Sequence, residues 1–344
     1  MALYNKINRD ELKAAMASSQ EKRITVSFYR YAKIADPQAF RDNLFQVWEA
    51  QGVMGRTYVA SEGINAQISV PKDNWDVFEQ HLDSIPFLDD LRLNLAFEDN
   101  GKSFYKLKIK VRPKIVADGL DDNTFDPGNG GTHLKAAEFN ELISREDSVL
   151  IDMRNHYESE VGHFQGAITP DVDTFRDSLP IIDEMLEEHR DKHIVMYCTG
   201  GIRCEKASAW FKHQGYENVY QLEGGIIKYA HDVKQEGLDN KFIGKNFVFD
   251  ERMGERITDD IIARCHQCGK AWDTHTNCKN VSCNLLLIQC DECAAKYEGT
   301  CCVECQEFIN LPEEEQRQRR KGTDSGVRIF SKGRFHISTA KSTR

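Results

Sequence analysis

The stretch YCTGGIRCEKA, residues 197–207, combines residue types that can activate a thiol. Cys198 ends an apolar run and is followed by two glycines and an arginine. Glycines allow a turn whose backbone N–H groups converge on one point, and a helix that begins just after the turn adds positive partial charge there. These groups and Arg203 favour a thiolate over a thiol, because each stabilises the anion. The stretch therefore predicts a nucleophilic cysteine, Cys198, in an anion-binding loop.

The length of this loop limits the chemistry that it can support. Four residues separate the cysteine from the arginine, namely Thr199, Gly200, Gly201 and Ile202. A cysteine phosphatase of this general plan has five, so that the loop wraps a tetrahedral oxyanion. We therefore expect a single sulfur or another small group on Cys198, and we disfavour phosphatase activity. Cys204 either resolves an oxidised or persulfidated Cys198 or is a small residue at the start of a helix, which we expect to begin near Cys204 or Glu205.

Two further charged residues follow a buried run in the same way. Asp152 and Arg154 come at the end of SVLIDMR, as Cys198 comes at the end of HIVMYC. Ligands of open α/β sheets bind at the carboxyl edge of the parallel strands. The pair therefore either positions the loop or forms a structural ion pair beneath it. His163, in GHFQGA, fits a turn-packing residue better than a catalytic base.

Nine of the eleven cysteines lie between residues 265 and 305. Paired Cys-x2-Cys motifs are typical of zinc sites, because each motif puts two thiolates on one tight turn. At least one site is predicted, from Cys265, Cys268, Cys290 and Cys293, and Cys278, Cys283, Cys302 and Cys305 could form a second. Cys301 is left over, and His266 or His275 could replace a cysteine. Four thiolates leave no open coordination position, so we expect structural zinc.

Length and composition indicate a globular protein of two or three domains. The chain has 344 residues, of which 40% are hydrophobic and 29% charged. Its N-terminal segment has no apolar stretch typical of a signal peptide, and no later run approaches a membrane span. We therefore expect a cytoplasmic protein that does not enter membranes, with cysteines that bind metal or do chemistry rather than form disulfides.

The first part of the chain predicts a ferredoxin-like α+β sandwich, residues 1–117. Alternating strand-like runs and helical runs follow the order β-α-β-β-α-β, with a last strand added. Asp36, Pro37 and Gly52 are placed to cap, start and stop the first of these helices. A linker rich in Gly, Asp and Asn, residues 118–131, follows. The polar SEGIN stretch at 61–65 either faces a substrate or is an ordinary hairpin turn.

The remainder predicts an α/β domain, a small lobe and a tail. Strands alternate with helices over 132–238, which indicates a parallel sheet covered on both faces. One long helical run there is expected to break at Pro180. The Cys-rich lobe is placed at 239–312 and a basic tail at 313–344. From Arg317 on, nine basic residues accompany a single acid, although the whole chain carries −10. Such an arm can bind phosphates or remain merely solvated.

The motifs together resemble a known family. IDMRNHYESEVGHFQGA at 151–167, the cysteine loop and VYQLEGGI form the pattern of a rhodanese domain. The first domain, GKNFVFDERMGERI at 244–257, CHQCG, HTNCKN and the arginine-rich end extend the resemblance to the bacterial rhodanese-domain tRNA uridine hydroxylases. The resemblance implies oxygen-dependent conversion of the wobble uridine of tRNA to 5-hydroxyuridine, with molecular oxygen as co-substrate. By motif, Cys198 is the required cysteine.

Two alternative functions remain open from the sequence. A sulfurtransferase would carry a persulfide on Cys198, and a non-catalytic protein would bind RNA through the zinc lobe and the tail. No flavin or nicotinamide fingerprint, Walker loop or His-Glu-x-x-His motif is present, so the sequence does not indicate how oxygen is activated. It indicates no protein partner and no oligomeric state.

Overall fold

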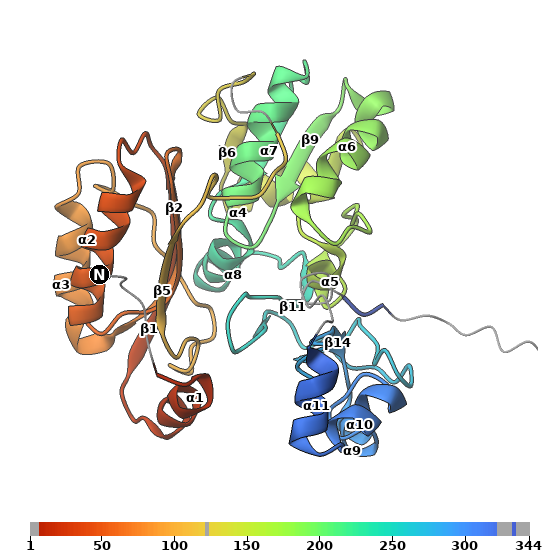
Figure 1. The fold of residues 1–344 in the computed structure, drawn as a ribbon. Helices are drawn as coiled ribbons and strands as arrows, with labels where there is room; N and C mark the ends of the chain where they lie inside the picture. The colour runs from red at the N-terminus through yellow and green to blue at the C-terminus, as the bar shows by residue number, and fades with distance from the viewer. Residues whose placement is uncertain (1–6, 121–123, 322–331, 335–344) are drawn as a thin grey trace, which may run out of the picture. The chain divides into compact units, whose positions relative to one another are not determined.

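The computed structural model describes residues 7–120, 124–321 and 332–334 (Figure 1). The chain divides into two compact units. The first runs up to Asn155, from Gln165 to Lys241 and from Val248 to Glu255. The second consists of His156–Phe164, Phe242–Phe247 and the described residues from Arg256 on. Within the described part of the chain, no helix is both long and apolar enough to cross a membrane.

The N-terminal domain of the first unit is built on a five-stranded sheet of order β4-β1-β3-β2-β5. Its strands are β1 (Arg23–Tyr31), β2 (Met54–Ala60), β3 (Gly63–Pro71), β4 (Asn94–Leu95) and β5 (Leu107–Val111). Its helices are α1 (Arg9–Ser18), α2 (Pro37–Ala50) and α3 (Trp75–Asp83). The predicted ferredoxin-like order is confirmed, and the added strand β5 pairs parallel with β2. The edge strand β4 has only two residues.

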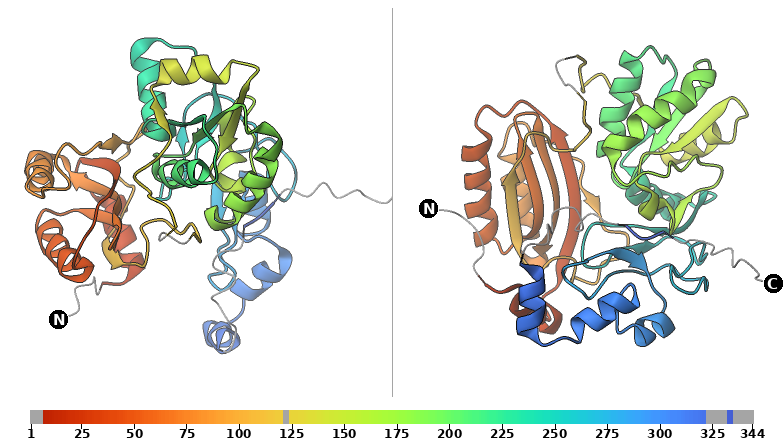
Figure 2. Two further views of the ribbon diagram at one scale, coloured as in Figure 1. Left: turned by 90° about the horizontal axis from the view of Figure 1, so that it is seen from above. Right: turned by 45° about the vertical axis from the view of Figure 1, so that its right-hand side comes forward.

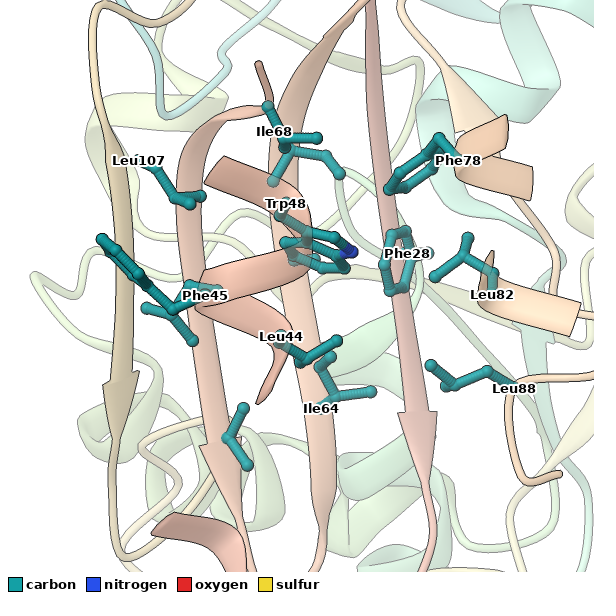
Figure 3. Close-up of a cluster of buried hydrophobic side chains, with 14 of the residues drawn as sticks. Phe28, Leu44, Phe45, Trp48, Ile64, Ile68, Phe78, Leu82, Leu88 and Leu107 are labelled. Carbon is teal, nitrogen blue, oxygen red and sulfur yellow. The ribbon is translucent and has the colours of Figure 1, made fainter. Parts of the chain in front are cut away.

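Helices α2 and α3 cover one face of this sheet (Figure 2). Between the helices and the strands lies an aromatic core in which Trp48 packs against Phe28 and Phe78 (Figure 3), with ring centroids 6.3 and 5.7 Å away. Asp36 caps α2 as predicted, since its carboxylate accepts hydrogen bonds from the backbone N–H groups of the first turn. Because strand side chains alternate, the opposite face of the sheet carries the polar residues.

The central domain is a four-stranded parallel sheet of order β6-β10-β9-β7. The strands are β6 (Thr132–Leu134), β7 (Ser148–Asp152), β9 (His193–Tyr197) and β10 (Val219–Leu222). The helices are α4 (Ala136–Ile143), α6 (Phe175–Leu186), α7 (Ile202–His213) and α8 (Gly225–Glu236). The predicted α/β architecture is confirmed.

Two local predictions in this domain were wrong. Pro180 lies inside α6 and does not break it. Leu179 and Ile182 on either side are buried in the core, and this packing outweighs the hydrogen bond that proline cannot make. The helix after the cysteine loop begins at Ile202, ahead of the expected start.

The second unit contains the cysteine-rich lobe. β8 (Gly162–Phe164) pairs antiparallel with β11 (Phe242–Asn246), and β12 (Glu255–Arg256) belongs to the same sheet. β13 (His275–Asn277) and β14 (Leu286–Ile288) form a hairpin whose second strand is fully apolar and buried. The remaining helices are α5 (His156–Ser159), α9 (Asp291–Lys296), α10 (Val303–Ile309) and α11 (Glu313–Arg320). Most of the basic tail lies outside the described residues.

Candidate active site and metal centres

The predicted cysteine loop lies at the carboxyl edge of the parallel sheet. Cys198 follows β9, which lies between β10 and β7, and the loop leads directly into α7. The Cys198 thiol is buried, and the backbone N–H of Gly201 donates a hydrogen bond to its Sγ at 3.1 Å. Gly201 has φ 103°, a conformation that a residue with a side chain rarely adopts. The glycine therefore turns a backbone donor toward the sulfur.

The surroundings of Cys198 stabilise its thiolate. Burial alone would raise the pKa of this thiol, but the Cys204 thiol, the Arg203 guanidinium and the backbone N–H groups of both residues lower it to about 5. Burial and the contact with Cys198 raise the pKa of Cys204 well above its usual value. At neutral pH the pair therefore consists of an anionic Cys198 and a neutral Cys204 that donates to it. An anionic sulfur is the nucleophilic form of cysteine.

The start of α8 fixes the backbone of the loop. The N–H groups of Ile226 and Ile227 donate to the carbonyl oxygens of Cys198 and Thr199, at 3.0 and 3.2 Å. Gly225 has φ 66°, and a Cβ atom there would come within 2.5 Å of the Cys198 carbonyl oxygen. The two carbonyls therefore point toward α8. Sequence reasoning gave Gly225 no role, although the double glycine one residue after β10 was a visible signal.

Asp152 and Arg154 form a buried ion pair next to the loop. Arg154 Nη2 lies 2.6 Å from Asp152 Oδ2 and its Nε lies 2.9 Å from Oδ1, so the pair is bidentate. The Tyr197 hydroxyl donates to Asp152 Oδ2 at 2.8 Å. Asp152 is also the register partner of Tyr197, the residue before Cys198. This geometry is that of an ion pair that holds the strand end from which the loop departs.

The polar face of the N-terminal sheet contacts the same loop. Asn94 Nδ2 donates to the Gly200 carbonyl oxygen at 3.3 Å. The Tyr29 hydroxyl donates to Glu205 in the first turn of α7, at 3.2 Å. Sequence reasoning missed both Tyr29 and Asn94, because nothing in the spacing of a strand residue indicates which distant loop it contacts.

A buried cation joins the two domains of the first unit. Lys206, in α7, is fully buried, and its Nζ lies 2.7 Å from Glu62 Oε2 and 3.4 Å from Asp118 Oδ2. Glu62 belongs to the SEGIN stretch, and its other oxygen accepts the backbone N–H of Ile115 at 2.7 Å. The structure thus gives this turn an ion-pairing role that neither sequence interpretation included.

A small, partly open pocket adjoins the loop. Thr199 lines it from the loop, Asn94 from the N-terminal sheet and Phe249 from the segment after β11. Arg252 closes another side through ion pairs with Asp250 and Glu255, at 2.5 and 2.7 Å. The pocket therefore combines apolar, amide and charged walls beside the cysteine loop.

Two groups of four cysteines gather in the second unit. Each group has all its sulfur atoms within 4.8 Å of one another, the first being Cys265, Cys268, Cys290 and Cys293 and the second Cys278, Cys283, Cys301 and Cys305. The edge of a tetrahedron with Zn–S bonds of about 2.3 Å is about 3.8 Å. Sulfur pairs such as Cys268–Cys290 at 3.6 Å and Cys283–Cys301 at 3.7 Å match that edge. Both sulfur sets fit a tetrahedral metal ion.

The second group differs from the predicted one. The structure places Cys301 in it, where the spacing predicted Cys302, and the Cys302 sulfur lies 3.8 Å from that of Cys301. Cys302 is the N-cap residue of α10, whereas the Cys301 sulfur lies 3.7 Å from that of Cys305. Neither histidine joins a group, since His266 pairs with Glu160 at 2.9 Å and His275 packs against the Phe247 ring.

Comparison with known proteins covers almost the whole chain. Three family models match in succession, described as the UPF0176 acylphosphatase like domain over 23–115, the rhodanese-like domain over 135–232 and the rhodanase C-terminal domain over 243–306. A tRNA uridine(34) hydroxylase from Salmonella arizonae is 57% identical over 338 residues, 98% of this chain and 97% of that protein. Another from Yersinia pestis is 58% identical, over 96% of this chain and 94% of that protein. The chain belongs to the tRNA uridine(34) hydroxylase family.

The family resemblance expected from the motifs is therefore confirmed. A solved rhodanese-like domain from Anabaena is also similar, with 18% identity, a TM-score of 0.27 and coverage of 33% of this chain and 78% of that one. In this member of the tRNA uridine(34) hydroxylase family, the structure places Cys198 at the start of the loop between β9 and α7, and Arg203 in the first turn of α7. It adds contacts from Tyr29, Asn94 and Gly225 to that arrangement.

Proposed function

We propose that this protein hydroxylates the wobble uridine of tRNA to 5-hydroxyuridine, with molecular oxygen as co-substrate and Cys198 as the essential nucleophile. Family membership over nearly the full chain supports the reaction. The single structural observation that carries the role of Cys198 is the hydrogen bond from the Gly201 N–H to its Sγ, in a loop beside a pocket. The Arg203 charge helps to lower the pKa of this thiol. The proposal places the protein in the cytoplasm, with tRNA.

The chemistry assigns each loop residue a task. In the overall reaction one oxygen atom enters at C5 of the uracil ring, and the other leaves as water with two electrons from a reductant. Cys198 supplies the sulfur nucleophile, while Arg203 and the converging N–H groups hold negative charge on that sulfur or on a small group attached to it. Asp152 and Arg154 are positioning residues, because they act on the loop through Tyr197.

Zinc is the metal that the two cysteine groups would hold. Four thiolates on tight turns are its preferred structural ligands. Backbone N–H groups donate to two of the sulfurs, from Cys290 to Cys265 and from Cys301 to Cys278, each at 3.4 Å. Such hydrogen bonds stabilise ligating thiolates. Zinc would tie β14, α9 and α10 into one lobe, and no step of the reaction needs it.

The proposed function is tested with tRNA from cells that lack the gene. The cells are complemented with the wild type, Cys198→Ser or Cys204→Ser, and nucleosides are quantified by mass spectrometry after digestion. We expect 5-hydroxyuridine with the wild type and none with Cys198→Ser. The purified wild type under ¹⁸O₂ should give heavy 5-hydroxyuridine, whereas label from water would contradict oxygen as co-substrate.

A sulfurtransferase is the second candidate, because the rhodanese-like match covers 135–232 and the Cys198 thiolate suits a persulfide. Thiosulfate-dependent thiocyanate formation by the wild type, with no change in tRNA nucleosides, would favour it. Restored nucleosides with Cys198→Ser would instead keep the tRNA reaction and remove the cysteine from it.

A further inference from the structure

One row of directly paired residues crosses all five strands of the N-terminal sheet. Reading from β5 to β4, each residue is the register partner of the next, in the order Lys108, Arg56, Gln67, Ser27 and Asn94. Paired residues point to the same face, and this is the polar face opposite α2 and α3. At about 4.8 Å per strand, this polar row is about 19 Å long.

The β5 end of the polar row is a cluster of cations. Arg56 and Lys108 are exposed, and Lys108 is flanked by Lys110 on β5 and by Lys106, the residue before that strand. No carboxylate pairs with any of the four within the described residues. Burial and then the charges of Lys110, Lys106 and Arg56 lower the pKa of Lys108. This cationic cluster is unusual in a chain of net charge −10, and bound anions would relieve its repulsion.

The β4 end of the polar row enters the pocket beside the cysteine loop. Gln67, Ser27 and Asn94 all line that pocket together with Thr199. The Gln67 amide and the Ser27 hydroxyl make no hydrogen bond to any part of the protein that the structure describes, so both remain available to a ligand. A pyrimidine base presents acceptors and a donor along one edge, which an amide can match.

We propose that the polar row is the binding surface for single-stranded RNA, with phosphates at the cationic cluster and a pyrimidine base in the pocket beside Thr199. Charge and shape indicate this ligand. The cationic cluster at the β5 end attracts a polyanion, and the pocket at the β4 end accepts a flat group that can form hydrogen bonds. Gln67 hydrogen-bonds the edge of the base. The inference rests on the proposed function, and it identifies the surface that binds the RNA substrate of that reaction.

RNA binding by the full-length protein tests the cationic cluster. The probe is a fluorescent RNA hairpin with an anticodon-like loop and uridine at the wobble position, followed by anisotropy over a range of salt concentrations. The triple variant Arg56→Gln, Lys108→Gln, Lys110→Gln should bind at least about tenfold more weakly. The plot of log Kd against log salt concentration should be less steep than that of the wild type, by a slope of about 2. The three lost phosphate contacts account for about 0.7 each.

Matched variants separate this surface from overall charge. Lys22→Gln, Lys33→Gln, Lys72→Gln removes three exposed lysines of the same domain that lie outside its strands, and it should bind as the wild type does. Lys108→Arg, Lys110→Arg keeps the charge and should also bind normally. An equal loss of RNA affinity in the two triple variants would overturn the proposal. No loss of affinity in either variant would also overturn it, and would favour an acidic protein as the partner of this surface.

Turnover tests the pocket. Gln67→Leu should raise KM for the hairpin about tenfold, since it removes a hydrogen bond to the bound base, and should change kcat little. Gln20→Leu, an exposed glutamine before β1, should change neither. An unchanged KM in Gln67→Leu would overturn the role of the pocket. If the wild type binds the hairpin through the cluster but forms no 5-hydroxyuridine, the proposed function fails while the binding surface stands.

Discussion

The hydroxyl of Tyr29 lies so close to the Cα of Gly201 that a Cβ atom there would stand 2.9 Å from it. The same hydroxyl donates to Glu205 Oε2, and that carboxylate also lies 3.0 Å from His133 Nε2. One side chain of the N-terminal sheet therefore contacts both the loop that donates to Cys198 and the helix that follows it. Glycine is therefore favoured at position 201 both by the Tyr29 side chain of the N-terminal domain and by its own φ of 103°.

Reaction of Cys198 should depend on pH in a defined window. The pKa of its thiol is lowered to about 5, so the thiolate is present above that pH and is lost as pH falls through it. The wild type should show more thiolate absorbance than Cys198→Ser. As pH is raised, this difference should appear with a midpoint near pH 5. In Cys204→Ala the midpoint should rise, because the donating thiol is removed. A midpoint near pH 8 or 9 in the wild type would contradict the stabilisation of the Cys198 thiolate by its loop.

Two glycines, at the first position of α8 and just after its end, offer a controlled test of loop packing. Gly225 and Gly237 have nearly the same φ, 66° and 65°, but a Cβ at Gly237 meets nothing within 4 Å. Both Gly→Ala variants carry backbone strain of about 1 kcal/mol. Only Gly225→Ala also displaces the Cys198 carbonyl, so it alone should lose most 5-hydroxyuridine formation. Similar activities in two folded variants would show that the loop tolerates the displacement.

Breaking the ion pair between the buried Lys206 and Glu62 should lower the stability of the protein. Glu62→Gln leaves Lys206 with a weaker partner, and Lys206→Met leaves Glu62 without its cation, while Asp118 keeps Lys114 at 2.7 Å. Each single change should lower stability by about 3 kcal/mol, the cost of an uncompensated buried charge. The double variant should lose less than the sum of the two, and thermal unfolding measures the difference. Strict additivity would mean that the pair contributes nothing specific.

Metal analysis can separate two adjacent cysteines. The purified protein should contain two zinc ions per chain. Cys301→Ser should lose one of them, because Cys301 belongs to the second sulfur group, whereas Cys302→Ser should keep both. The reverse result would restore the ligand set expected from Cys-x2-Cys spacing. Strong chelators should unfold the lobe, since thiolate sites of this kind stabilise small domains that have little apolar core.

The elements predicted correctly are those whose signals are local. The cap at Asp36 and the stop at Gly52 define α2, and buried runs define β7 and β9, so the loop at Cys198 could be located from the sequence. Spacing does not distinguish neighbouring residues in the second cysteine group, where the structure gathers Cys301 and the spacing predicted Cys302.

Long-range contacts were not predictable in the same way. Tyr29 and Lys206 gain their roles from partners more than a hundred residues away along the chain, and no local pattern encodes such a pair. Pro180 shows the reverse effect, since tertiary packing there overrides a strong local signal.

The pairing of β8 with β11 has a consequence for synthesis on the ribosome. β8 belongs to the second unit, but the strands and helices from β9 to α8 of the first unit stand between it and its partner in the chain. At about 5–20 residues per second, β8 waits several seconds for β11 to be made. The second unit therefore cannot complete its fold until the central domain has been translated, and no single cut in the chain separates the two units. A truncated chain that ends after α8 leaves β8 as an unpaired strand, exposed to aggregation.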